Sequence, residues 1–501
     1  MNKRFVRLDD MIRQGRGQEA ISEIVELGEK RLPREDRVYL ANLARRVGHS
    51  ELSLKWLNRI VRGEASRSKT VATRDEKIEY AAALIQVGVI REARKLLETI
   101  DTVDADVLLQ FAFTHFREWN YREARIVLDR ALKFAGLPKY TRLILNSNYA
   151  ACLVHLDLRS EYAELLPTLL KETNSDVYKR LNLSVMQLVA EGAIQRQDWA
   201  QAESYLKKIE MAHEQESALL QLYVRRWRWV LKAERGGIER RVLLTELNAL
   251  KREAQRLGDF ETLRDLERRR ARLTANENLF RKVYRGTPHA AYRKDLEIEF
   301  KKQFGKELGL QLNMALHLKG YAKDLRSVST RIASSKLSLK YGQKLHRALR
   351  ALLDDFYNPP SLASFHDKVF EESYYNPLSS PNRVHQLLRR LRRELESLKL
   401  PLEIEVKGKL IYLRAARPIE IAIESESQRQ PSSRLLTIRI HFGEEDFKVN
   451  DAAKVLGVSS RTAFRVIEEG VELSLLRSIG NGRRRRYLFS VHVGHGPPVI
   501  V

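Results

Sequence analysis

The chain has 501 residues, a formal net charge of +25 and a pI of about 9.9. Hydrophobic residues make up 43% of it, so the chain can bury real cores, is not globally disordered, and has length for about three domains. The excess of positive charge favours a polyanionic partner, and the absence of an apolar run of about 18 residues excludes a bilayer-spanning helix.

Two further features indicate a cytoplasmic protein. The sequence contains a single cysteine, Cys152, which cannot form a disulfide within the chain and lies in an apolar helical pattern typical of packing. The first residues, MNKRFVRLDDM, are basic but lack the apolar core of a secretory signal.

Residues 1–275 repeat one pattern: a turn with glycine or a polar residue, then Glu-Ala or a similar small pair, then leucines at helical spacing. The small positions recur about 31 to 41 residues apart, as expected for two-helix repeats whose apolar faces cover one another. Clear copies place this position at Ala20, Leu52, Ala93 and Ala124, and weaker copies place it at Ala163 and Ala202.

The copy from Trp119 to Leu132, WNYREARIVLDRAL, resembles tetratricopeptide repeats. This resemblance implies an α-solenoid that binds a protein partner or a second copy of the chain through its concave surface. The alternative is a plain scaffold that spaces or dimerises the rest of the protein. Trp227 and Trp229 stand between arginines, and helical spacing predicts that they lie in the core.

Residues 276–335 form a connecting region in which short strands and helices are both expected. In residues 336–417 the pattern predicts helices over 341–353 and 361–370 and a long helix after Pro381, with Ser380 as its cap. A strand, the turn Lys407-Gly408-Lys409 and a second strand follow. The long helix carries a leucine stripe flanked by four arginines: Arg389, Arg390, Arg392 and Arg393.

This unit resembles the output winged helix of two-component response regulators, through its arginine-rich helix and the basic hairpin that follows. The resemblance implies that the helix lies in a DNA major groove and that Lys407 and Lys409 contact DNA. The receiver domain usual in that family is absent from the chain, and the helical repeats stand in its place. The alternative is a solvated amphipathic helix or a short dimer seam.

Residues 418–446 are predicted to be a linker followed by a strand over 435–442. Residues 447–490 then read as a helix up to Leu456, a stop at Gly457, and a second helix capped by Ser459 or Ser460. Two strands around Gly480-Asn481-Gly482 complete a hairpin, and residues 491–501 are a tail.

The 447–490 segment resembles the winged helix-turn-helix of small bacterial transcriptional regulators. The resemblance rests on its Asp-Ala-Ala start, the Leu-Gly-Val-Ser turn, the Arg-Thr-Ala helix and the Gly-Asn-Gly-Arg hairpin. It implies that Arg461, Thr462 and Arg465 approach base edges while Ser459 and Ser460 cap the helix or hold phosphate. The hairpin residues expected on phosphates or the minor groove are Arg483, Arg484, Arg485 and Arg486.

No enzyme signature accompanies these units. The chain has no phosphate-binding GxxxxGK[ST] loop, no HExxH, and too few cysteines for a multi-cysteine zinc site. We therefore predict no catalytic residues, no metal and no cofactor.

Together these features predict a mainly α protein in which a tetratricopeptide-like α-solenoid precedes two small α+β winged-helix units. The expected function is a cytoplasmic transcriptional regulator that binds double-stranded DNA and does not enter a membrane. Two alternatives remain. In one, the winged helices bind protein within a helical-repeat scaffold subunit, and in the other the chain is an RNA-binding factor.

Overall fold

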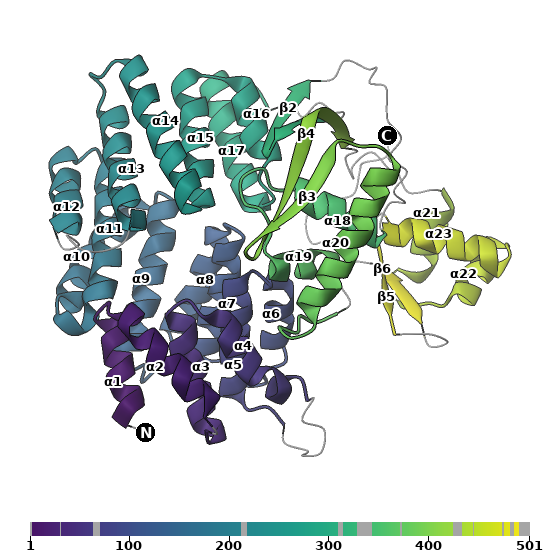
Figure 1. Ribbon diagram of the computed structural model, residues 1–501, viewed down its shortest axis with the longest axis horizontal. Coiled ribbons are helices and arrows are strands. Elements are labelled where there is room, and N and C mark those ends of the chain that lie inside the picture. Colours follow the sequence, from purple (N-terminus) through teal and green to yellow (C-terminus); the bar gives the residue numbers. More distant parts are fainter. Residues whose placement is uncertain are drawn as a thin grey trace.

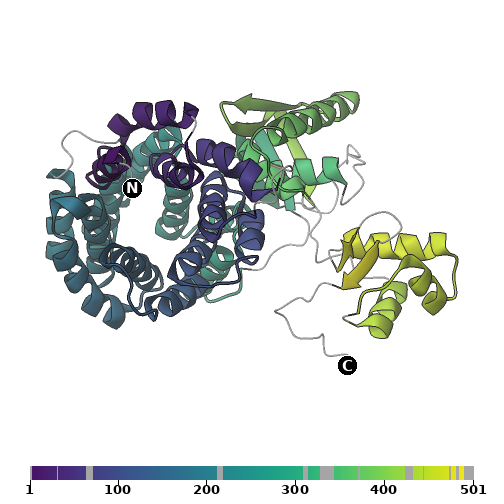
Figure 2. The ribbon, with the colours of Figure 1, turned by 90° about the horizontal axis from the view of Figure 1, so that it is seen from below.

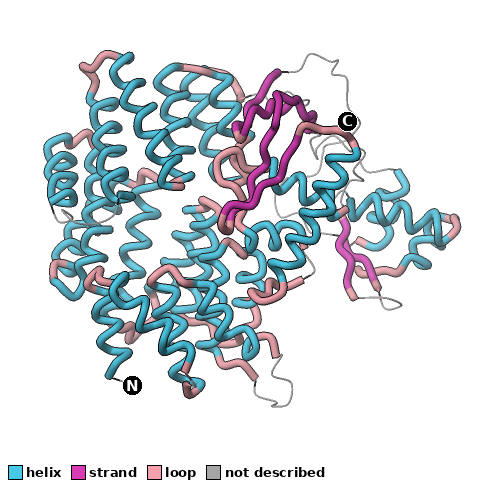
Figure 3. The backbone as a smooth tube through the Cα atoms, in the orientation of Figure 1, coloured by secondary structure: helices cyan, strands magenta, loops and turns pink. Residues whose placement is uncertain are grey.

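The structure is a computed structural model. It describes residues 3–30, 32–63, 71–211, 218–308, 314–327, 343–370, 373–423, 433–443, 445–472, 475–480 and 485–489. Helices dominate, and short antiparallel sheets lie in the C-terminal part (Figure 3). We refer to residues 3–304 as the helical array, to residues 314–423 as the proximal unit, and to residues 433–489 as the distal unit.

The helical array consists of consecutive helices that pack on their neighbours along the chain (Figure 1). Viewed from below, it curls into a ring (Figure 2). Its helices are α1 (Lys3–Arg13), α2 (Gly17–Glu29), α3 (Arg34–Arg46), α4 (Ser50–Val61), α5 (Arg74–Val87), α6 (Ile90–Leu97), α7 (Ala105–Arg117), α8 (Tyr121–Leu132), α9 (Lys139–His155), α10 (Arg159–Thr173), the 3-10 turn η1 (Asp176–Tyr178), α11 (Lys179–Gln195), α12 (Trp199–Met211), α13 (Ala218–Arg235), α14 (Arg240–Leu257), α15 (Phe260–Thr274), α16 (Glu277–Arg285) and α17 (Ala290–Phe304).

Four of the repeated small residues have the packing role expected of them. Ala20, Ala93, Ala124 and Ala202 lie near the starts of α2, α6, α8 and α12, and all four are fully buried. At the other two positions, Leu52 is half-buried, and Ala163 of α10 is exposed while its neighbour Tyr162 is buried instead. A methyl side chain lets the axes of two helices approach, and neighbouring leucines fill the groove between them. Trp227 and Trp229 are also buried, which confirms that they belong to the core.

Distant parts of the array touch, which closes its curve. The Arg13 guanidinium of α1 lies 4.2 Å from the centre of the Tyr140 ring in α9. Trp119, before α8, meets Tyr292 of α17 edge to face, with 5.0 Å between ring centres. Such aromatic and cation–π contacts fix relative orientation as well as burying surface.

The proximal unit is built on one four-stranded antiparallel sheet with strand order β2-β1-β4-β3. Its strands are β1 (Met314–Gly320), β2 (Ala322–Ser327), β3 (Leu402–Lys407) and β4 (Leu410–Ile423). Strand β4 extends past residue 417 and so includes the first residues of the segment 418–446, whose start was predicted to be a linker. Its first half pairs with β3 and its second half with β1, so the hairpin at 314–327 in the connecting region completes this sheet.

Helices α18 (Lys344–Leu353), α19 (Leu362–Val369) and α20 (Ser380–Ser397) pack on the sheet and bury a shared core with it. Ser361 caps α19 by accepting a hydrogen bond from the Ser364 amide at 3.0 Å. Ser380 does not cap α20, because the helix already begins there. Its hydroxyl instead accepts from the Asn376 amide at 2.9 Å.

The distal unit contains α21 (Ser433–Phe442), α22 (Val449–Leu456), α23 (Ser460–Glu472) and a hairpin of β5 (Leu476–Ile479) and β6 (Arg486–Phe489). The strand predicted over 435–442 is wrong, because this segment is helix α21. Its β-branched composition favoured a strand, but Leu435 and Ile438, three residues apart, lie together in the core under α22 and α23.

Contacts with the array hold the proximal unit in place from two directions. On one side, the Arg91 amide donates to Asp367 at 3.2 Å, and Glu92 accepts from the Tyr375 amide. Ala363 and Tyr375 lie within the apolar core of α5 and α6.

On the other side, Arg264 of α15 forms a buried ion pair with Asp355 at 2.7 Å, and the two side chains are 0% and 6% exposed. Burial alone would lower the pKa of Arg264, but Asp355 and Glu261 outweigh burial and raise the pKa. The Tyr357 hydroxyl donates to Glu267 at 3.0 Å. The proximal unit therefore joins α5–α6 to α15.

Candidate nucleic-acid interface

The start of α23 is held rigidly against α22. Gly457 ends α22 in the left-handed conformation at φ 62°, which glycine adopts without a Cβ penalty. The Ser459 hydroxyl accepts a hydrogen bond from the Thr462 amide at 3.3 Å and so caps the next helix. The Ser460 hydroxyl donates to the Asn450 side chain at 2.9 Å. Of the two serines expected at this cap, Ser459 has the capping role.

Arg461 and Arg465 lie one helical turn apart and are both exposed, so they share an outer face of α23. Neither forms an ion pair within the described part of the chain. Thr462 is half-buried, and its hydroxyl lies 3.0 Å from that of Ser459, so it is less available than the arginines. The inner face buries Ala463, Val466 and Ile467.

Charge along α23 changes sign from its first half to its second. The arginines occupy the first half, and Glu468 and Glu469 follow in the second. A polyanion is attracted to the first half and repelled by the second. The amino-terminal end is therefore the part of this helix suited to face nucleic acid.

The distal hairpin presents fewer free arginines than the sequence suggested. Arg485 is exposed, whereas Arg486 pairs with Asp446 at 2.7 Å and also donates to its carbonyl oxygen at 3.1 Å. Arg483 and Arg484 lie outside the described residues. Arg477 of β5 is also exposed, although it was not among the candidate residues predicted from the sequence. Its alternation with the buried Leu476 would have indicated an outward side chain.

Helix α20 of the proximal unit divides its four arginines between two roles. Arg389, Arg390 and Arg393 are exposed. Arg392 is half-buried, and its Nε donates to the Ile404 carbonyl oxygen of β3 at 3.0 Å, which ties the helix to the sheet. The leucine stripe is buried inside the unit, so it is not a free dimer seam.

Sequence reasoning overlooked His385 and Gln386, both exposed on α20. They lie four residues before Arg389 and Arg390, so the helical period places them on the same side. That spacing was the available signal. With the three exposed arginines, they form a polar outer face on this helix.

The turn between β3 and β4 is occupied by contacts within the protein. Lys407 donates to the Tyr321 hydroxyl at 3.1 Å and lies 3.1 Å from Glu405, and these bonds raise its pKa. Lys409 forms an ion pair with Glu51 of α4 at 2.7 Å. Both lysines remain largely exposed, but the Lys409–Glu51 pair shows that this turn contacts the helical array.

Within the described residues, no group of three or more His, Cys, Asp or Glu side chains is arranged to hold a metal ion. Cys152 is buried, and burial raises the pKa of its thiol to about 12, so the thiolate is scarce at neutral pH. None of the described helices is long and apolar enough to cross a membrane.

No protein-family model matches this chain, and no curated protein matches it in sequence.

Proposed function

We propose that the protein is a DNA-binding transcriptional regulator whose distal and proximal units are winged helices. One observation carries the proposal. Arg461 and Arg465 project without acidic partners from the start of α23, which Ser459 caps and α22 supports. A rigid helix start with free guanidinium groups suits the edges of guanine bases in a major groove.

The rest of the distal unit supports this orientation. The acidic second half of α23 faces away from the phosphates when only its first turns enter the groove. Arg485 and Arg477 on the hairpin then supply charge for the flanking backbone. Residues 447–490 contain nine Lys or Arg against four Asp or Glu, so the attraction is general as well as local.

The proximal unit provides a second contact through the outer face of α20. Arg389, Arg390 and Arg393 are available for phosphates, while Arg392 and Lys409 serve the fold. If both units engage one duplex, the second binding event is intramolecular, and overall affinity gains from effective concentration.

The helical array supplies the regulatory input in this proposal, as a tetratricopeptide-like surface for a protein partner or a second copy. Its junction with the proximal unit supports this role. Because α5–α6 and α15 both contact the proximal unit, a partner that alters their spacing also acts on α20.

The test begins with selection of bound fragments from random duplexes by the full-length protein. Affinity for the selected site and for random DNA is then measured for Arg461→Ala/Arg465→Ala. The matched control is Arg434→Ala/Arg439→Ala, which removes two exposed arginines from α21 of the same unit. We expect the α23 variant to lose roughly 1–3 kcal/mol per bidentate contact on the selected site, and less on random DNA.

Equal losses on both DNAs would mean that these arginines touch only phosphates. Unchanged binding, or an equal loss in the α21 control, would remove α23 from the interface. Competition with folded RNA separates the RNA-binding alternative, since a groove-reading helix prefers B-form duplex. No binding to duplex DNA at low salt would favour the protein-scaffold alternative.

A further inference from the structure

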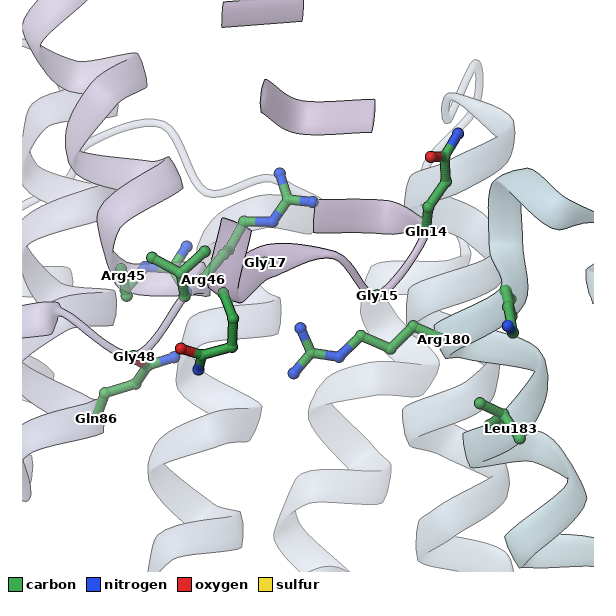
Figure 4. Close-up of a pocket in the computed structure, with 12 residues that line it drawn as sticks. Gln14, Gly15, Gly17, Arg45, Arg46, Gly48, Gln86, Arg180 and Leu183 are labelled. Carbon is green, nitrogen blue, oxygen red and sulfur yellow. The ribbon is translucent and has the colours of Figure 1, made fainter. Parts of the chain in front are cut away.

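A cavity of about 520 Å³ lies in the helical array, away from both small units. One side of it is formed by the α1–α2 turn, the α3–α4 turn and the end of α5, and the opposite side by the start of α11 (Figure 4). Arg13 lies over the ring of Tyr140 in α9, and that ring stacks on Tyr178 directly before α11, so these contacts link the two sides. A volume of this size is in the range of small-molecule sites.

The cavity is cationic. Arg45, Arg46, Lys179 and Arg180 line it, and no acidic side chain is among its lining residues. Two of these charges are neutralised from behind, because Arg45 pairs with Glu79 at 2.6 Å and Arg46 pairs with Asp9.

Lys179 and Arg180 differ from that pair. Both are exposed, and neither has an ion-pair partner in the described part of the chain. The Arg180 side chain extends from α11 into the space in front of Gly17 (Figure 4). The cavity therefore holds two positive charges that the protein does not compensate.

Neutral donors accompany these charges. Helix α2 begins at Gly17, and no side chain caps its first turn. Gly17 and Gln18, the first two residues of α2, line the cavity, so the positive end of the helix dipole borders it. The Glu19 amide already donates to the Arg16 carbonyl oxygen at 3.2 Å, so the amides of Gly17 and Gln18 are the ones left for a ligand. Gln14 and Gln18 line the same wall and add amide groups.

We propose that this cavity binds a small molecule bearing a phosphate group. A phosphate monoester carries about two negative charges at neutral pH, which matches the two uncompensated cations, whereas one carboxylate supplies only one. The Arg180 fork holds two phosphate oxygens, Lys179 acts as a point charge, and the first amides of α2 complete the cradle. This site is independent of the DNA-binding proposal, because it uses none of the residues of the small units.

The experiment is calorimetry on the full-length protein with adenosine monophosphate as the probe. The test variant is Lys179→Ala/Arg180→Ala. The matched control is Arg130→Ala/Lys207→Ala, which removes the same charge from exposed positions on α8 and α12 outside the cavity. Both variants keep the distal unit intact, so any binding of the probe there cancels in the comparison.

We expect the test variant to bind at least about tenfold more weakly than the wild type, and the control to match the wild type. Gln18→Glu, which places a carboxylate in the cavity while keeping all the cations, should weaken binding comparably. Inorganic phosphate should compete with the probe, and adenosine should not bind.

Three results would overturn the proposal. They are no detectable binding of the probe by the wild type, equal losses in the test and control variants, or tighter binding of citrate than of inorganic phosphate. Because all the substituted side chains are exposed, the variants are expected to fold, and unchanged melting temperatures would verify this.

Discussion

The proximal and distal units combine similar parts in opposite relations to the rest of the protein. The proximal unit packs its helices against a four-stranded sheet and the distal unit packs its helices against a hairpin, and each unit has arginines on an outward helix. The proximal unit shares buried contacts with α5–α6 and α15, including the Arg264–Asp355 pair. The described elements of the distal unit pack chiefly on one another, and the unit stands apart from the array in Figure 2.

The two units therefore differ in how their exposed arginines are placed: contacts with the array fix the proximal helix, whereas the distal helix is placed by its own unit. The array fixes where the proximal helix α20 lies, and uses some of its unit's cations, such as Lys409, to do so. The distal unit keeps Arg461 and Arg465 free. Basic residues near an interface within the protein should therefore be checked for intramolecular contacts before they are assigned to a ligand, because the same side chains also form internal ion pairs and hydrogen bonds.

Asp355→Asn should have the largest effect, because it removes the closer and more buried of the two carboxylates that pair with the buried Arg264 and leaves only Glu261, at 3.2 Å. We expect the free energy of unfolding to fall by about 3 kcal/mol. Hydrogen exchange should show weaker protection in the proximal unit and α15, and unchanged protection in the distal unit. Arg252→Ala, at an exposed position on α14, is the control. Weaker protection in the distal unit as well would show that its stability depends on the junction between the array and the proximal unit.

His366→Phe tests the docked interface by pH. Both ring nitrogens of His366 are buried without a hydrogen-bond partner in the described structure, and its ring stacks on Phe370 at 4.8 Å. Burial, with Arg383 and Arg91 nearby, lowers its pKa to about 4. The unfolded chain therefore binds a proton at His366 more readily than the folded protein does. The contribution of the neutral His366 to folding stability is complete above about pH 6.5 and is lost as the pH falls to about 4.

The wild type should lose about 3 kcal/mol of stability across that window through this residue, and the variant should not. Urea unfolding at pH 7 and at pH 4.5 measures the difference. His385→Gln, on the exposed face of α20, should retain the wild-type dependence. An identical pH dependence in wild type and His366→Phe would show that this histidine is not responsible.

Replacing Arg389, Arg390 and Arg393 with alanine should weaken DNA binding moderately. The slope of log affinity against log salt should become shallower by about 0.9 for each phosphate that the variant no longer neutralises. Arg392→Ala should instead lower stability and leave the slope nearly unchanged, because its guanidinium serves β3. A slope equal to that of the wild type after the triple change would leave the distal unit as the sole interface.

Glu51→Gln should have the smallest effect. It releases Lys409 from an ion pair in which both side chains are well exposed, 43% for Glu51 and 67% for Lys409. Exposed pairs contribute under about 1 kcal/mol, so the melting temperature should shift little. A loss above about 2 kcal/mol would identify this turn as a principal anchor of the proximal unit.

Local signals in the sequence predicted much of the fold. Gly457 and the two serines Ser459 and Ser460 marked the boundary between α22 and α23, because a left-handed stop and a hydroxyl cap act within a few residues. The buried alanines of the array followed from their spacing. These features need no information about the rest of the chain.

The errors arose where distant contacts decide. Residues 435–442 have strand-like composition, yet the core under α22 selects a helix. Arg392 and Lys409 look like their neighbours in sequence, and only the positions of Ile404 and Glu51 reveal their internal roles. The cavity between α2 and α11 joins residues more than 130 positions apart, so no local pattern could indicate it.

The junction between α6 and the proximal unit has a consequence for biosynthesis. Glu92 and Tyr375, which meet there, are 283 residues apart in the chain. At a synthesis rate of about 5–20 residues per second, the α5–α6 surface emerges roughly 15–60 s before its partner. During that interval the apolar surface around Tyr80, which Ala363 and Tyr375 later cover, is exposed to solvent. This exposure makes the nascent chain a natural client for a ribosome-associated chaperone.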